Sequence, residues 1–257
     1  TISLLEEGAT IPFIARYRKE QTNNLDEVSI LNIQNALARF AEVAKRKEYI
    51  LGVLQEKGVN NEELLKKINQ SFDLNRIEDL YLPYKTKRKT KAEQARNAGL
   101  TGLAKIIMKQ DNGDPIAAAQ RFIHKDYPTT DDAIAGATFI MADWMNENEV
   151  VRDRMRSSFI EHGVLITKLV KTKKDQADKY RDFFDFTQRL KGCPSYRLLA
   201  ALRGGDEGLL RIKIEPNKEY ALNWLERFFV KNNNAAATIV KGAIKDAYKR
   251  LLQPAFE

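Results

Sequence analysis

The feature that most constrains the fold is the stretch 26–57, which contains no proline. Its apolar residues recur at seven-residue intervals, which predicts one amphipathic helix of roughly thirty residues, about 45 Å long. The two positions of the repeat read Ile30, Leu37, Ala44, Leu51 and Ile33, Phe40, Lys47, Leu54. Because Lys47 interrupts the apolar seam, the pattern favours a long helix packed inside one domain over a dimeric coiled coil.

Glycine and proline number only 13 and 7 in 257 residues, so helices are expected over most of the chain. A second long helical pattern begins near residue 133, with a break expected near 146–148. Two segments, 164–170 and 209–214, read as strands. The predicted fold class is therefore mainly α: a multi-helix domain with long amphipathic helices and a minor β element. The two strands could pair with each other; a hairpin of 209–214 with 196–202 is the alternative.

Further elements are expected between the two strands. Residues 176–184 look helical, and Ser195 is placed to cap a short helix over 196–202. The sequence RGGDEG at 203–208 is predicted to form a tight turn. A nucleotide-binding glycine loop would follow a strand and open a helix, whereas this run precedes a strand, so the turn is favoured.

The most concentrated charge follows an aromatic-proline turn at residues 81–84. Five basic residues lie within seven positions: Lys85, Lys87, Arg88, Lys89 and Lys91. Thr90 and Glu93 then have the spacing of a helix capping box, and Gly99 is placed to end that helix. A short helix, a glycine turn and another helix after basic residues is compatible with a helix-turn-helix-like unit over about 61–110.

The net charge of +8 favours anionic partners. The five basic residues of 85–91 are candidate phosphate contacts that would bind backbone rather than read sequence, with Tyr81 or Tyr84 available for stacking. The alternative is a solvated face. A second basic group lies on a predicted helix whose apolar side would carry Phe13, Ile14 and Tyr17. Its members are Arg16, Arg18 and Lys19.

Motifs for catalysis, cofactors or metals are not found. There is no GxxxxGK[ST] or GxSxG motif, and His124 and His162 lack metal-ligand spacing. Cys193 is the only cysteine, which excludes an internal disulfide and a cysteine-rich metal site. We therefore expect no enzyme activity, cofactor, metal or small-molecule substrate. Without an 18-residue apolar run or a signal peptide, we expect no membrane span and a cytoplasmic setting.

Four ordered segments resemble the Tex family, the bacterial transcription accessory proteins related to a eukaryotic elongation factor. They are EGATIPFIARYRKE (7–20), DLYLPYKTKRKTKAEQARNAGLTGLA (79–104), residues 194–210, and DAYKRLLQP (246–254). Together they span nearly the whole chain. Two departures are Asn23-Asn24, where the family usually has a glycine, and Tyr196, where it usually has a histidine; the second argues against any role that needs an imidazole there.

The resemblance implies that the chain is the helical N-terminal region, with a helix-turn-helix-like module, of a multidomain protein that binds nucleic acid. In the family, ribonuclease-H-like, helix-hairpin-helix and OB-fold domains follow this region. None of these three domains is recognisable in this sequence. Much of the family's RNA affinity is credited to the OB-fold. The implied partners are RNA or DNA, with RNA polymerase or transcription factors. The expected role is a non-catalytic basic surface. The alternative is a scaffold that positions downstream domains or docks on the transcription machinery without binding nucleic acid itself.

Overall fold

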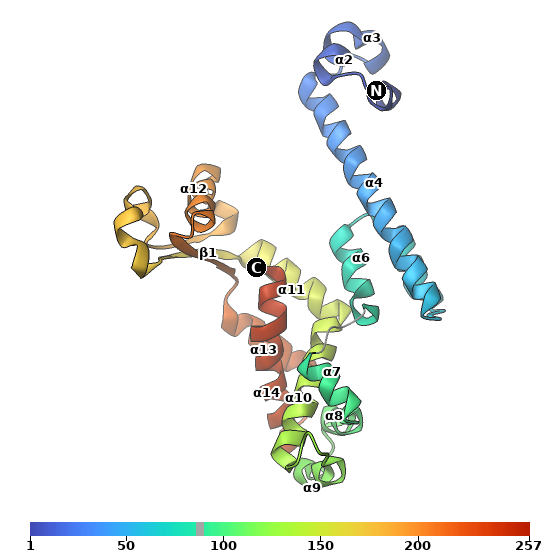
Figure 1. Cartoon of the computed structure of the whole chain (residues 1–257), viewed down its shortest axis with the longest axis vertical. Coiled ribbons are helices and arrows are strands. Elements are labelled where there is room, and N and C mark those ends of the chain that lie inside the picture. Colours follow the sequence, from blue (N-terminus) through green and yellow to red (C-terminus); the bar gives the residue numbers. More distant parts are fainter. Residues whose placement is uncertain (86–89) are drawn as a thin grey trace. The chain divides into compact units, whose positions relative to one another are not determined.

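A computed structural model describes residues 1–85 and 90–257, and the chain forms two compact units, Thr1–Lys85 and Thr86–Glu257. Helices dominate both units, and a three-stranded antiparallel sheet lies in the second (Figure 1). The predicted class, mainly α with a minor β element, is confirmed. Within the described residues, every helix is too short or too polar to span a membrane.

The first unit is organised along one long helix, α4 (Glu27–Glu56), which confirms the helix predicted over 26–57. Asp26 caps it by accepting a hydrogen bond from the Ser29 amide at 2.7 Å. The other elements are α1 (Ile2–Glu6), α2 (Ile11–Tyr17), α3 (Lys19–Thr22), α5 (Glu62–Gln70), α6 (Leu74–Tyr81) and the 3₁₀ turn η1 (Leu82–Tyr84).

Two separate apolar clusters hold the two ends of α4. Ile30 is buried with Ile14 and Ala15 of α2 at the start of the helix. Ile50 and Leu54 are buried with residues of α5 and α6 near its end. Side chains between the clusters, including Leu31 and Phe40, remain 44% and 52% exposed. The helix lies within one unit, as predicted, and part of its middle stays exposed because α5 and α6 reach it only from Val43 onward.

The residues that connect α3 to α4 explain one departure from the family pattern. Asn23 and Asn24 have φ values of 54° and 61°, in the left-handed region that favours glycine. Asparagine adopts this conformation more readily than other non-glycine residues, because its short side chain hydrogen-bonds locally. The two asparagines therefore make a left-handed turn at the place where the resemblance leads one to expect a glycine.

In the second unit, helices pack around α10 (Thr130–Glu147), which has a face of small and apolar residues including Ala133, Ala137 and Ile140. Asn148 ends α10 and caps the next helix, so the predicted break near 146–148 is confirmed. The surrounding helices are α7 (Lys91–Asn97), α8 (Thr101–Lys109), α9 (Pro115–Ala119), α11 (Glu149–His162), α13 (Lys218–Phe229), α14 (Ala235–Ala247) and α15 (Gln253–Phe256). A 3₁₀ turn, η2 (Gln120–Phe122), follows α9, and a π-helical turn, η6 (Tyr248–Leu252), joins α14 to α15.

The sheet has the strand order β2-β1-β3, with both pairs antiparallel. Strands β1 (Val164–Leu169) and β3 (Leu210–Glu215) are the predicted pair, and the alternative hairpin with 196–202 was wrong because those residues are helical. Strand β2 (Asp185–Arg189) was not predicted. The segment 176–184, expected to be helical, forms mainly the 3₁₀ turn η4 (Asp178–Phe183). A further 3₁₀ turn, η3 (Lys171–Gln176), precedes it, and η5 (Leu190–Gly192) follows β2.

Helix α12 (Ser195–Asp206) extends through most of the RGGDEG run, so the predicted tight turn at 203–208 was wrong in its extent. Gly204 and Gly205 are helical and face β3, where an added Cβ would lie inside contact distance of Leu210 and Ile212. They permit close packing of the helix on the strand. Only Gly208, with φ +66°, makes the turn.

The helix-turn-helix-like unit over 61–110 stays a prediction. Helices α5 and α6 belong to the first unit, and α7 and α8 to the second. The α7–α8 pair does have the expected glycine turn, since Gly99 has φ +80°.

Replacing Gly204 by alanine tests the close packing of α12 on β3. The new Cβ would lie 2.5 Å from Leu210 Cδ1, so we expect a loss of about 1–2 kcal/mol in the free energy of unfolding. Gly242→Ala is the matched control, because Gly242 is a helical glycine of α14 with open space at the Cβ position. It should gain about 0.5–1 kcal/mol.

Urea unfolding followed by tryptophan fluorescence measures both variants, because Trp144 and Trp224 both lie in the second unit. Equal effects of the two substitutions would contradict the packing role of Gly204.

Candidate nucleic-acid interface

The basic residues predicted to contact phosphate fall into three sets. Lys87, Arg88 and Lys89 lie outside the described residues. Lys85 is exposed and ends the first unit, whereas Lys91 begins α7 in the second. Arg16, Arg18 and Lys19 lie on α2 and α3, around the start of α4.

Lys91 is the first residue of a capped helix. Thr90 accepts a hydrogen bond from the Glu93 amide at 3.1 Å, which confirms the predicted Thr90 cap. The Lys91 ammonium lies 5.0 Å from the centre of the Phe139 ring, and the Arg250 guanidinium lies 5.4 Å from the same ring. Two cations therefore flank one half-buried aromatic side chain, and both are within cation–π range.

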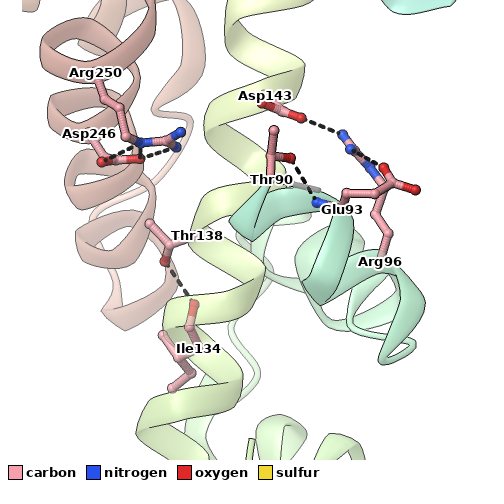
Figure 2. A network of polar contacts seen from close by, with 8 residues as sticks. All are labelled: Thr90, Glu93, Arg96, Ile134, Thr138, Asp143, Asp246 and Arg250. Atoms are coloured by element: carbon pink, nitrogen blue, oxygen red, sulfur yellow. Dashed lines mark hydrogen bonds and ion pairs between the residues drawn. The ribbon is translucent and has the colours of Figure 1, made fainter. Parts of the chain in front are cut away.

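An ion pair connects α7 to α10 (Figure 2). Arg96 Nη2 donates to Asp143 Oδ2 at 3.0 Å, and Arg96 Nη1 donates to Glu93 Oε2 at 3.4 Å. The side chains of Arg96 and Asp143 are only 21% and 12% exposed. Such partly buried, charge-assisted contacts are stronger than surface ion pairs. They hold the helix that starts directly after the basic run.

Arg250 is held in the same region by Asp246, one turn earlier (Figure 2). Its Nη2 donates to Asp246 Oδ2 at 2.7 Å, and its Nε donates to both carboxylate oxygens at 3.1 Å. These hydrogen bonds raise the pKa of Arg250 further. Arg250 therefore stays protonated, and the Asp246 carboxylate largely neutralises its charge.

The α2–α3 surface, defined as Phe13, Arg16, Tyr17, Arg18 and Lys19, combines exposed aromatic and basic groups. Phe13 and Tyr17 are 40% and 68% exposed, and their ring centres lie 5.5 Å apart. The Arg18 guanidinium lies 5.2 Å from the centre of the Phe13 ring. The expectation that Phe13 and Tyr17 face the core was wrong: Ile14 and Ala15 fill that role. The proximity of these aromatics to the arginines in sequence was the signal that could have identified them.

Lys85 and the α2–α3 surface lie at opposite ends of α4. Arg16 is 3.9 Å from Glu27, the first residue of α4. At the other end, Lys57 Nζ donates to the Tyr84 carbonyl at 2.6 Å, next to Lys85. A helix of this length separates them by roughly 45 Å. They therefore form two separate basic surfaces.

The aromatic-proline turn before the basic run is structural. Tyr81 is only 3% exposed, and burial raises the pKa of its hydroxyl. It packs with Ile77 and Leu80 in the cluster that holds α4, and Tyr84 packs against the same cluster. The suggestion that Tyr81 could stack on a base was wrong, because its ring is not accessible.

The other residues singled out in the sequence are His124, His162 and Cys193. Among the described residues, no three His, Cys, Asp or Glu side chains are grouped to hold a metal ion. His124 lies in a turn and pairs with Asp126 at 3.7 Å, whereas His162 ends α11. The Cys193 thiol is 3.7 Å from the Pro194 carbonyl oxygen.

Comparison with known proteins gives two family matches. Residues 110–253 match the model described as Tex central region-like, and residues 1–55 match the one described as Tex-like protein N-terminal domain. Together these models cover most of the chain.

Three similar proteins show how much of a longer protein is present. An uncharacterized protein of Bacillus subtilis is 36% identical over all of this chain, which covers 36% of that protein. The transcriptional accessory protein Tex of Neisseria gonorrhoeae is 36% identical over 83% of this chain and 28% of its own length. The human S1 RNA-binding domain-containing protein 1 is 27% identical over 98% of this chain and 27% of its own length. The chain thus spans about a third or less of these relatives.

Substituting Arg96 by glutamine tests the anchor between α7 and α10. Because Asp143 would lose a charged partner in a partly buried place, we expect a loss of about 1–3 kcal/mol in the free energy of unfolding. Arg181→Gln is the matched control, since its ion pair with Asp178 is about 70% exposed on both sides. That control should change stability by less than about 0.5 kcal/mol.

Tryptophan fluorescence in urea gives the two free energies, and hydrogen exchange at the α7 amides shows whether the helix loosens. Unchanged exchange in Arg96→Gln would contradict the anchoring role.

Proposed function

This chain belongs to the Tex family, and on that premise we propose that it is a non-catalytic segment of a transcription accessory protein that contacts nucleic acid. The observation that carries the proposal is the α2–α3 surface. Exposed aromatic rings beside arginines suit single-stranded nucleic acid, because bases stack on the rings while cations contact phosphates.

The chemistry of the α2–α3 surface supports a single strand rather than a duplex. Phe13 and Tyr17 are on the same helix, four residues apart, and each exposes a large part of its ring. Unpaired bases offer their faces to such rings, whereas stacked bases inside a duplex do not. Arg16 and Lys19 supply cations on either side of Tyr17 in sequence, without any group placed to read base edges.

The basic run 85–91 is the second part of the proposal. Lys85 is exposed in the first unit, and Lys91 starts α7, whose position depends on the Arg96–Asp143 pair. We propose that these two lysines, with Lys87, Arg88 and Lys89, contact phosphates irrespective of sequence. The transcription-related name of the Neisseria relative and the RNA-binding name of the human relative support the same class of partner.

A salt titration of binding to a short single-stranded RNA tests both surfaces. Neutralising Arg16, Arg18 and Lys19 to glutamine should weaken binding and make the slope of log affinity against log salt shallower by about 2, because three cations no longer displace counterions. Neutralising Lys87, Arg88 and Lys89 should do the same. Phe13→Ala with Tyr17→Ala should weaken binding by about tenfold or more with little change in slope, since stacking is not ionic.

The matched control neutralises Lys105, Lys109 and Arg121, which are exposed and lie outside both surfaces. If this control lowers the affinity and the slope as much as the two basic variants do, the binding reflects net charge alone and the proposal is wrong. Fluorescence anisotropy of labelled RNA measures each affinity.

A scaffold role is the second candidate, and the exposed apolar residues of the first unit favour it. Phe40 on α4 and Phe72 after α5 are 52% and 65% exposed, with ring centres 5.8 Å apart. If this role replaces nucleic-acid contact, the unmodified chain should bind purified RNA polymerase and the Phe40→Ser variant should not. Neither the unmodified chain nor the variant should then bind RNA measurably. Measurable salt-dependent RNA binding would reject it as the sole function.

A further inference from the structure

A pocket of about 650 Å³ lies between one face of the sheet, α11 and the start of α13 in the second unit. We call it the α11–α13 pocket. The strand register builds one wall: Val164 of β1 lies opposite Arg189 of β2 on one side and Glu215 of β3 on the other. Residues directly opposite in antiparallel strands point to the same face, so these three side chains share the pocket.

The charge in the α11–α13 pocket is positive. Arg189 and Lys218 line it, and in the part of the chain that the structure describes neither side chain forms an ion pair or hydrogen bond. The one carboxylate in the lining, Glu215, is already occupied by Lys213 Nζ at 2.7 Å and Gln253 Nε2 at 2.9 Å. An anion entering the pocket would therefore meet two cations without competing acidic partners.

The pocket also lies at the start of α13, since Asn217 and Lys218 line it. Asn217 caps this twelve-residue helix by accepting a hydrogen bond from the Tyr220 amide at 3.1 Å. The amides of Lys218 and Glu219 belong to the first turn, where no intrahelical acceptor exists. The helix dipole favours negative charge at this end. Phosphate groups are commonly held by this combination of first-turn amides and dipole.

A buried hydroxyl also lines the pocket without a partner. Ser158 of α11 is 4% exposed, and its Oγ forms no hydrogen bond. A buried polar group left unpaired is costly, and such groups in native proteins usually have a missing partner. Rotation of the Ser158 side chain toward the pocket would let a bound oxygen atom become that partner.

Aromatic groups form the remaining wall. The rings of His162 and Tyr220 meet edge to face, with centres 6.3 Å apart. Arg154 Nη2 donates to the Tyr220 hydroxyl, and the Arg154 guanidinium lies 5.6 Å from the Tyr220 ring centre. Tyr220 is thus fixed in place. A flat heteroaromatic group could lie against this wall while Val164 covers its other side.

We propose that the α11–α13 pocket binds a nucleotide. The phosphate lies between Arg189, Lys218 and the α13 amides, and the base lies against Tyr220 and His162. The pocket volume is in the range of small-ligand sites. The ligand chemistry is a nucleoside phosphate, either free or at the end of an RNA strand. This proposal is independent of the α2–α3 surface, which lies in the other unit.

Isothermal titration of the chain with uridine 5′-monophosphate, inorganic phosphate and uridine tests the pocket. We expect the monophosphate to bind more tightly than either part. The variant Arg189→Gln with Lys218→Gln should bind it at least about tenfold more weakly, because two charge-assisted contacts are lost. Lys105→Gln with Arg121→Gln removes the same charge outside the pocket and should bind like the unmodified protein. Amide NMR of the unmodified protein should show shifts at Lys218 and Glu219 on titration.

A pair of short oligouridylates, with and without a 5′-phosphate, separates the two sources of the ligand. Tighter binding of the phosphorylated strand, lost in Arg189→Gln with Lys218→Gln, assigns the pocket to a strand end. Equal binding of the two strands, with the monophosphate still bound, assigns it to a free nucleotide. The proposal is overturned if the monophosphate binds no better than uridine, or if the pocket variant and its control bind it equally.

Discussion

The second unit depends on how closely its helices approach α10. Gly136, in the middle of that helix, has no side chain because Leu100 and Tyr127 occupy the space where a Cβ would be. Leu100 is fully buried and immediately precedes α8. This close approach lets the chain at the start of α8 pack tightly on α10, and α7, α8 and α14 share one continuous apolar core with that helix.

The positions of Lys85 and Lys91 within their own units follow from local packing. Helix α7 is fixed to α10 by buried Ala92 and Ala95 and by the Arg96–Asp143 pair, so Lys91 has a defined place at its start. In the first unit, buried Tyr81 and the Lys57 contact to the Tyr84 carbonyl fix the chain just before Lys85. Lys85 and Lys91 therefore each lie next to a well-packed part of their own unit. Tyr81 serves the core rather than a ligand, because its ring is buried.

Helix identity and the strand pair could be read from the sequence, because apolar spacing and caps are local properties. The side chains of Asp26, Thr90 and Asn148 each cap a helix by accepting a hydrogen bond from the backbone amide three residues later, which is well within reach of sequence patterns. Burial could not be read in this way. Whether Phe40 or Tyr17 is covered depends on which other elements reach it, and those contacts come from residues distant in the chain. The glycines at 204–205 were misassigned for the same reason: their cause is the contact with β3, not a turn.

The candidate sites likewise combine features that neighbouring residues in the sequence reveal with features that only contacts between distant residues reveal. Arg16 and Arg18 were identified by composition alone, but the exposed rings beside them required the packing of Ile14 to be known. The α11–α13 pocket had no sequence signal, since Ser158, Arg189 and Lys218 come from three separate elements joined only by the fold.

The net charge therefore says less about where this chain could bind an anion than the contacts of each basic residue do. Arg46 pairs with Glu78 to connect α4 to α6, Arg96 pairs with Asp143, and Arg250 pairs with Asp246. These arginines stabilise the fold, and a ligand would have to compete with a carboxylate to reach them. Arg189 and Lys218 have no such carboxylate among the described residues, and neither does Arg18. Because an unpaired cation needs no exchange of partners to accept a phosphate, these residues are among those whose positive charge is available for binding.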